Sequence, residues 1–186
     1  MRSLRRTSVA GLEPLAPRRK WRAILLATLL LTPAYWSLVA GLVATGTETD
    51  DAPIAAPYIA FGLVMIPFVF VVLAFLSEHP RAPGAVVKAM TLAVLVGIPI
   101  SAIAADAVTG LVAGIGAGGI AALRADIGDD TKRRVIAVVI VSAASFVLLR
   151  SIPEVALLLA PVLPFTSLGV ADHLSERRNA VKPAGP

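Results

Sequence analysis

Three glycines in the stretch GLVAGIGAGGIAAL, residues 110–123, have the spacing of a loop that holds a dinucleotide pyrophosphate. The pattern is Gly114-x-Gly116-x-x-Gly119. Such a loop needs a β-strand before it and an acidic residue about 20 positions further on. Here the glycines lie inside an apolar run bounded by Asp106 and Arg124, and no strand candidate precedes them. The sequence therefore argues against a nucleotide site, and we expect no cofactor.

Side chains suited to catalysis or metal binding are few and scattered. The chain has no cysteine and only two histidines, which do not form a pair at metal-ligand spacing. It has no Gly-x-Ser-x-Gly motif, and Ser101, Ser142 and Ser145 have no candidate base beside them. We therefore expect a protein that is not an enzyme, with neither catalytic nor metal-binding residues.

The composition indicates an all-α integral membrane protein. Hydrophobic residues make up 57% of the 186 residues, charged residues only 16%, and the mean hydropathy is +0.83. This is more apolar surface than a soluble domain of this length can bury. Six apolar runs predict six transmembrane helices in three antiparallel hairpins, at 21–46, 54–76, 85–105, 107–123, 135–152 and 155–171. The last three runs are short, so a four-helix alternative with a re-entrant apolar pair stays open.

The basic residues predict the orientation. With this set of helices, every Lys and Arg except Arg150 falls on the same side as the two termini. By the positive-inside bias that side is cytoplasmic, which predicts a protein of the cell membrane. The net charge of +5 then reflects topology and attraction to anionic lipid, so we expect membrane lipid but no nucleic acid as a partner. We expect flexible cytoplasmic tails at 1–19 and 174–186 around one transmembrane domain, 20–173, and the abundance of Ala, Val and Arg favours a bacterial source.

The glycine-rich run 107–123 has one face of small side chains. At 100° per residue, six small residues fall on one arc, while bulky Val, Leu and Ile residues cover the other. The six are Gly110, Ala113, Gly114, Ala117, Gly118 and Ala121. This spacing lets another membrane helix approach closely. The face is expected to pack within the monomer, against a second copy or another membrane protein, or along a solute path.

Prolines and charges near the helix ends give further expectations. Kinks are predicted where proline interrupts an apolar run, at Pro33, Pro67, Pro99 and Pro161. Asp106 is placed to cap the helix that follows it, and SIPE, residues 151–154, has the form of a capping box. Asp106, Arg150 and Glu154 are expected to form an external charge cluster that clamps the fourth, fifth and sixth helices together.

No charged residue lies near the middle of a predicted span, so the usual means of coupling transport to protons or cations are missing. The sequence favours a non-enzymatic structural or accessory subunit that packs against a membrane partner. The alternative is a small permease or channel for an uncharged or weakly charged solute, with kinked helices along its path.

Overall fold

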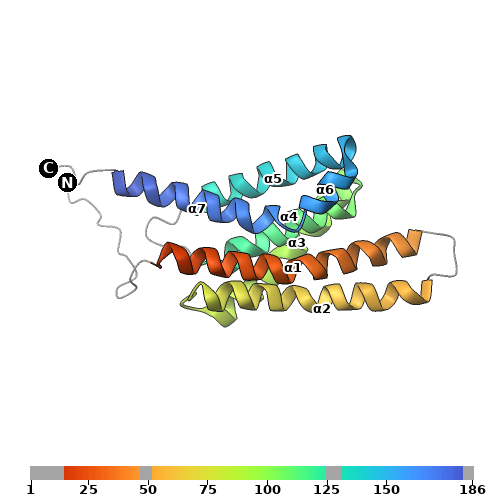
Figure 1. Ribbon diagram of the computed structural model, residues 1–186, viewed down its shortest axis with the longest axis horizontal. Coiled ribbons are helices and arrows are strands. Elements are labelled where there is room, and N and C mark those ends of the chain that lie inside the picture. Colours follow the sequence, from red (N-terminus) through yellow and green to blue (C-terminus); the bar gives the residue numbers. More distant parts are fainter. Residues whose placement is uncertain (1–14, 47–51, 125–130, 182–186) are drawn as a thin grey trace.

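The computed structural model describes residues 15–46, 52–124 and 131–181, and this part of the chain is entirely helical (Figure 1). The helices are α1 (Pro17–Gly46), α2 (Ala52–Leu76), α3 (Ala82–Ala104), α4 (Ala107–Ala122), α5 (Thr131–Ser151), α6 (Pro153–Leu159) and α7 (Leu163–Val181). The all-α expectation is confirmed for these residues.

Four helices, α1, α2, α3 and α5, are long and apolar enough to cross a membrane. A fifth crossing results if α6 and α7 are taken as one broken span, since together they pass the same test but are bent by 62°. The side chains agree with a membrane setting, because α3 leaves large apolar residues uncovered, with Ile103 82% exposed. The described residues thus contain four or five candidate spans, which is compatible with a multi-pass membrane protein.

Two of the six predicted spans differ from the structure. The run 107–123 forms α4, which has 16 residues and a length of about 24 Å, less than the roughly 30 Å of a hydrocarbon core. The run 155–171 is not one helix, because the chain turns at residues 160–162, between α6 and α7. Pro161 lies in this turn and Pro164 just after it, and neither can supply the backbone N–H that a continuous helix would need.

The two ends of the helical bundle differ in character. Lys20 at the start of α1, Glu78 after α2 and Arg134 at the start of α5 lie at one end, which we call the charged end. The other end, where Asp106 starts α4, we call the opposite end. In Figure 1 the first turn of α1 and the last turn of α7 lie together at the charged end.

The tail boundaries also need correction. The flexible segments were expected at 1–19 and 174–186, but α1 already begins at Pro17 and α7 continues to Val181. Charge pairing explains the extra helical turns, because Lys20 near the start of α1 forms ion pairs with Asp172 and Glu176 of α7. Residues 1–14 and 182–186 lie outside the described residues.

α4 lies at the centre of the fold and is buried on almost every side. Its neighbours are α2, α3, α5 and α7. The sequence predicted a bulky side for this helix facing away from its small-residue face, yet Val112 and Ile115 on that side are also buried. Because α4 is enclosed by protein, its short length does not have to match a bilayer.

Candidate functional site

The three glycines of the nucleotide-like pattern contact three different helices. A Cβ atom added at Gly114 would lie 2.5 Å from the carbonyl oxygen of Ala93 in α3. At Gly116 it would meet Val138 of α5 at 3.2 Å, and at Gly119 it would meet Leu168 of α7 at 2.7 Å. The absence of side chains therefore allows close helix packing around α4, which gives these glycines a structural reason unrelated to phosphate binding.

The small-residue face of α4 is divided between two environments. Its glycine half, Gly110, Gly114 and Gly118, lies against α3, where added Cβ atoms would fall within 3 Å of backbone atoms. Its alanine half, Ala113, Ala117 and Ala121, lines a groove. α3 thus covers the glycines, whereas the alanines lie at the bottom of a groove, with Ala113 2% and Ala117 6% exposed.

We call this groove the α3–α5 groove, since α3 and α5 form its walls and α4 its floor. It consists of two adjoining cavities of about 460 and 370 Å³. Val96, Val138 and Val139 line both cavities, which makes the groove continuous along the helices. The cavity nearer the opposite end is lined mainly by apolar side chains, together with Thr109 and Ser142.

The mouth of the groove at the charged end is basic. His79, Lys88 and Arg134 line it. Burial lowers the pKa of His79 below its usual 6.5, and the positive charges of Arg134, Arg124 and Lys88 lower it further. His79 also accepts a hydrogen bond at Nδ1 from the backbone N–H of Arg81, at 3.1 Å. Near neutral pH the ring is uncharged, so Lys88 supplies the positive charge at the mouth, because the charge of Arg134 is balanced by Asp172.

Arg134 is the most highly connected side chain at the charged end. Its Nε and Nη2 atoms donate to the two carboxylate oxygens of Asp172, at 2.8 and 2.7 Å. Only 4% of the Arg134 side chain and 11% of the Asp172 side chain are exposed. This bidentate geometry is the strong form of an arginine–carboxylate pair. It joins the first turn of α5 to the middle of α7.

The same guanidinium also closes the end of α4. Arg134 donates to the carbonyl oxygens of Ile120, Leu123 and Arg124, at 3.1, 3.1 and 3.2 Å. The last carbonyls of a helix lack partners within it and carry partial negative charge, so a cation is favourable there. One buried arginine therefore fixes α4, α5 and α7 relative to one another.

Further ion pairs extend this network to α1 and to the turn after α2. Lys20 lies 3.6 Å from Asp172 and also pairs with Glu176. Glu78 pairs with Arg19, and its other oxygen lies 3.9 Å from Arg124. We call the set formed by Arg19, Lys20, Glu78, Arg124, Arg134, Asp172 and Glu176 the charged-end network.

At the opposite end, the expected external cluster does not form an ion pair among the described residues. Asp106 does cap α4 as predicted, accepting hydrogen bonds from the backbone N–H groups of Val108 and Thr109 at 3.1 and 2.9 Å. The Arg150 guanidinium instead lies over the ring of Phe146, one turn back on α5, with 4.8 Å to its centroid. Glu154 lies in the first turn of α6.

The capping box expected at SIPE is not formed. Ser151 belongs to α5, and Ile152 occupies the N-cap of α6 without a side-chain hydrogen bond. Of the four prolines expected to kink helices, Pro33, Pro67 and Pro99 lie within continuous helices. Pro161 lies in the turn between α6 and α7, so there the helix breaks.

The charged-end network was not foreseen from the sequence. Arg134 directly precedes the predicted fifth span and Asp172 directly follows the sixth, so opposite charges flank adjacent span ends on one side. From that charge pattern an ion pair between Arg134 and Asp172 could have been predicted. Gly41 and Gly62 were also missed: added Cβ atoms would lie 2.5 Å from Ile59 and 2.4 Å from Leu38, so both glycines permit close packing of α1 on α2.

Comparisons with known proteins give no match to any family model, curated protein or solved structure. Within the described ranges, no three His, Asp or Glu side chains are grouped so that they could hold a metal ion. The functional interpretation therefore depends on the groove and on the charged end.

Proposed function

We propose that this protein is a non-enzymatic accessory subunit of the cell membrane whose α3–α5 groove receives a transmembrane helix of a partner protein. The observation that carries the proposal is the floor of the groove. Ala113, Ala117 and Ala121 recur every four residues along α4 and form the floor of the groove, where Ala113 and Ala117 are only 2% and 6% exposed. In a membrane, small residues at this spacing let a second helix approach closely enough for van der Waals contact.

The walls of the groove and its mouth fit the same occupant. α3 and α5 present apolar side chains along it, including Val96 and Val139, which a membrane helix can cover. Lys88 makes the mouth positive, so we expect an acidic group near the matching end of the partner helix. If the protein self-associates, a second copy of the chain supplies the helix that occupies the groove.

Six crossings in three antiparallel hairpins, with the charged end in the cytoplasm, complete the proposal. α1 packs along α2 and α3 along α4. Four helix termini lie at the charged end: the start of α1, the end of α2, the end of α4 and the start of α5. This is the arrangement expected if successive helices cross in alternating directions. Because α4 is enclosed, it can cross with fewer residues than a lipid-facing helix needs. Both termini would then be cytoplasmic.

The partner site is tested by filling the groove. Ala117→Trp places a large side chain on the floor and should lower recovery of the cross-linked partner by at least about tenfold, since overpacking costs about 1–3 kcal/mol. A photo-cross-linking residue at Val96 or Val139, used in native membranes, should capture the same protein from both walls. Val87→Trp is the matched control, because Val87 is exposed on α3 and does not line the groove.

Two results would contradict this assignment. One is undiminished capture after Ala117→Trp in a protein that is still folded. The other is equal capture from Leu29, an exposed residue of α1.

A permease remains the second candidate because of the broken pair α6–α7. Tyr35 of α1 belongs to the same buried cluster as Ala160 at this break, and its buried hydroxyl has no hydrogen-bond partner among the described residues. Broken helices and unpaired polar groups at membrane depth can form solute sites. Tyr35→Phe separates the two proposals: it should leave partner capture unchanged in an accessory subunit, whereas a permease would lose flux of its solute.

A further inference from the structure

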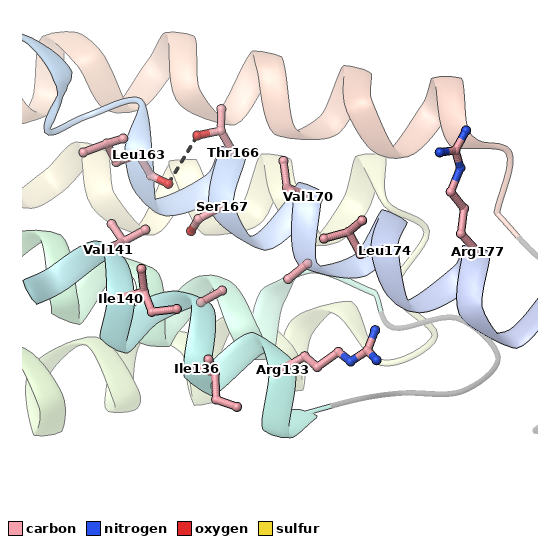
Figure 2. A pocket seen from close by; sticks show the side chains of 12 residues that line it. Arg133, Ile136, Ile140, Val141, Leu163, Thr166, Ser167, Val170, Leu174 and Arg177 are labelled. Carbon is pink, nitrogen blue, oxygen red and sulfur yellow. Dashed lines mark hydrogen bonds between the residues drawn. The ribbon is translucent and has the colours of Figure 1, made fainter. Parts of the chain in front are cut away.

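A second groove lies on another face of the protein, between α5 and α7 (Figure 2). Its volume is about 860 Å³. Exposed aliphatic side chains line most of it, among them Ile136 and Ile140 of α5 and Val170 and Leu174 of α7. Thr166 and Ser167 also line it, but their hydroxyls donate to the carbonyl oxygens of Val162, just before α7, and Pro164, at 2.7 and 2.9 Å. The body of the groove is therefore apolar in its contacts.

Two arginines border this groove, and both lie at the same end. Arg133 lies in the first turn of α5 and Arg177 near the end of α7, so both are at the charged end of the bundle, although in Figure 2 the Arg177 side chain extends away from Arg133. No carboxylate lines the groove. An occupant that matches this surface has a long apolar part and one anionic end.

From these features we infer that the α5–α7 groove binds an anionic phospholipid, with an acyl chain along the groove and the phosphate at Arg133 and Arg177. The length of the groove agrees with that of a lipid in one leaflet. Leu163 and Arg177 lie about 21 Å apart along α7, at about 1.5 Å per residue. One leaflet contributes about half of the roughly 30 Å hydrocarbon core, which leaves length for the headgroup. Arginine suits a phosphate because its planar group can donate two parallel hydrogen bonds.

The position of the arginines agrees with the headgroup region of a membrane. Arg133 precedes the buried Arg134, and Arg177 follows Glu176, so both lie next to the charged-end network, where the helices leave the apolar zone. Arg133 also donates to Ser175 at 3.3 Å, which holds its side chain between α5 and α7. The bound lipid would cover apolar side chains of both helices.

Thermal unfolding of the full chain in detergent, with added lipid, tests this inference. Phosphatidylglycerol should raise the melting temperature more than phosphatidylcholine with the same acyl chains, and inorganic phosphate at the same concentration should give no shift. The Arg133→Gln/Arg177→Gln double variant should bind phosphatidylglycerol about tenfold more weakly, as expected for lost charge-assisted hydrogen bonds. Ala137→Phe, within the groove, should weaken binding of the lipid without changing the charge.

Arg150→Gln is the charge-matched control, since Arg150 lies at the opposite end and should leave lipid binding unchanged. Arg177→Gln alone, at an exposed residue, keeps the test valid if the double variant does not fold. The inference is overturned if either arginine variant, once folded, binds phosphatidylglycerol as the unmodified protein does. Equal shifts with the two lipids, or a shift with inorganic phosphate alone, would overturn it as well.

Discussion

Asp172→Asn is expected to lower the free energy of unfolding by about 3–5 kcal/mol, because it leaves the buried guanidinium of Arg134 without its counter-charge. Arg134→Gln should cost a similar amount, since it also removes the hydrogen bonds to the last carbonyls of α4. Equilibrium unfolding in mixed detergent micelles measures both effects.

A double-mutant cycle separates the ion pair from the closure of α4. In the Arg134→Gln/Asp172→Asn variant, the two losses should combine to less than their sum, because each single change already breaks the shared pair. Arg150→Gln is the control for removal of one arginine from α5, and it should change the stability by well under 1 kcal/mol. Strictly additive losses would show that Arg134 and Asp172 act separately.

Gly114→Ala is expected to destabilise the protein by about 1–3 kcal/mol, although alanine is the better helix former. The new methyl group would lie 2.5 Å from the carbonyl oxygen of Ala93 and 3.0 Å from Cα of Gly97. Both are backbone atoms of α3, which cannot turn aside as a flexible side chain could. α3 and α4 must therefore move apart, and a thermal-shift series in detergent will report the loss.

The matched control for Gly114 is Gly84, near the start of α3. A Cβ atom there meets no heavy atom within 4 Å, so Gly84→Ala should leave the stability unchanged or slightly raised. If Gly114→Ala and Gly84→Ala had the same effect, close contact between α3 and α4 would not limit the stability.

Hydropathy alone was enough to predict an all-helical chain with several candidate membrane spans, but not how each apolar run is built into the fold. α4 reads as a lipid-facing helix because length and composition do not reveal that protein surrounds it. The turn at Pro161 could not be distinguished from a kink, since a membrane helix can continue through proline, as α1 does at Pro33. Local sequence does not specify which of these outcomes tertiary packing selects.

The sequence predicts a helix end where a side chain caps the helix, but not where the backbone conformation alone ends it. Asp106 was identified correctly because an acidic residue before an apolar run is a recognised signal. α2 and α3 instead end in left-handed residues, Glu78 at φ 53° and Ala105 at φ 50°, where glycine is usual. Neither residue type marks such a turn in a sequence.

For the candidate site, the periodicity of α4 predicted its small-residue face but not the division of that face. Only the position of α3 shows that the glycines are covered while Ala113, Ala117 and Ala121 line a groove. The charged-end network was hidden for a related reason: Arg134 and Asp172 are far apart in sequence, and the positive-inside bias explains the arginine without any partner.

The proposed function places both grooves in a chain that crosses the membrane six times with its charged end in the cytoplasm. Single cysteines in this cysteine-free chain measure that directly, at Thr45 and Ile152 towards the opposite end and at Thr131 at the charged end. In intact cells, an impermeant maleimide should label Thr45→Cys and Ile152→Cys, and should label Thr131→Cys only after permeabilisation. Labelling of Thr131→Cys in intact cells would contradict the proposed topology: together with labelling of Thr45→Cys it would mean that α2, α3 and α4 do not all cross, and without it that the orientation is reversed.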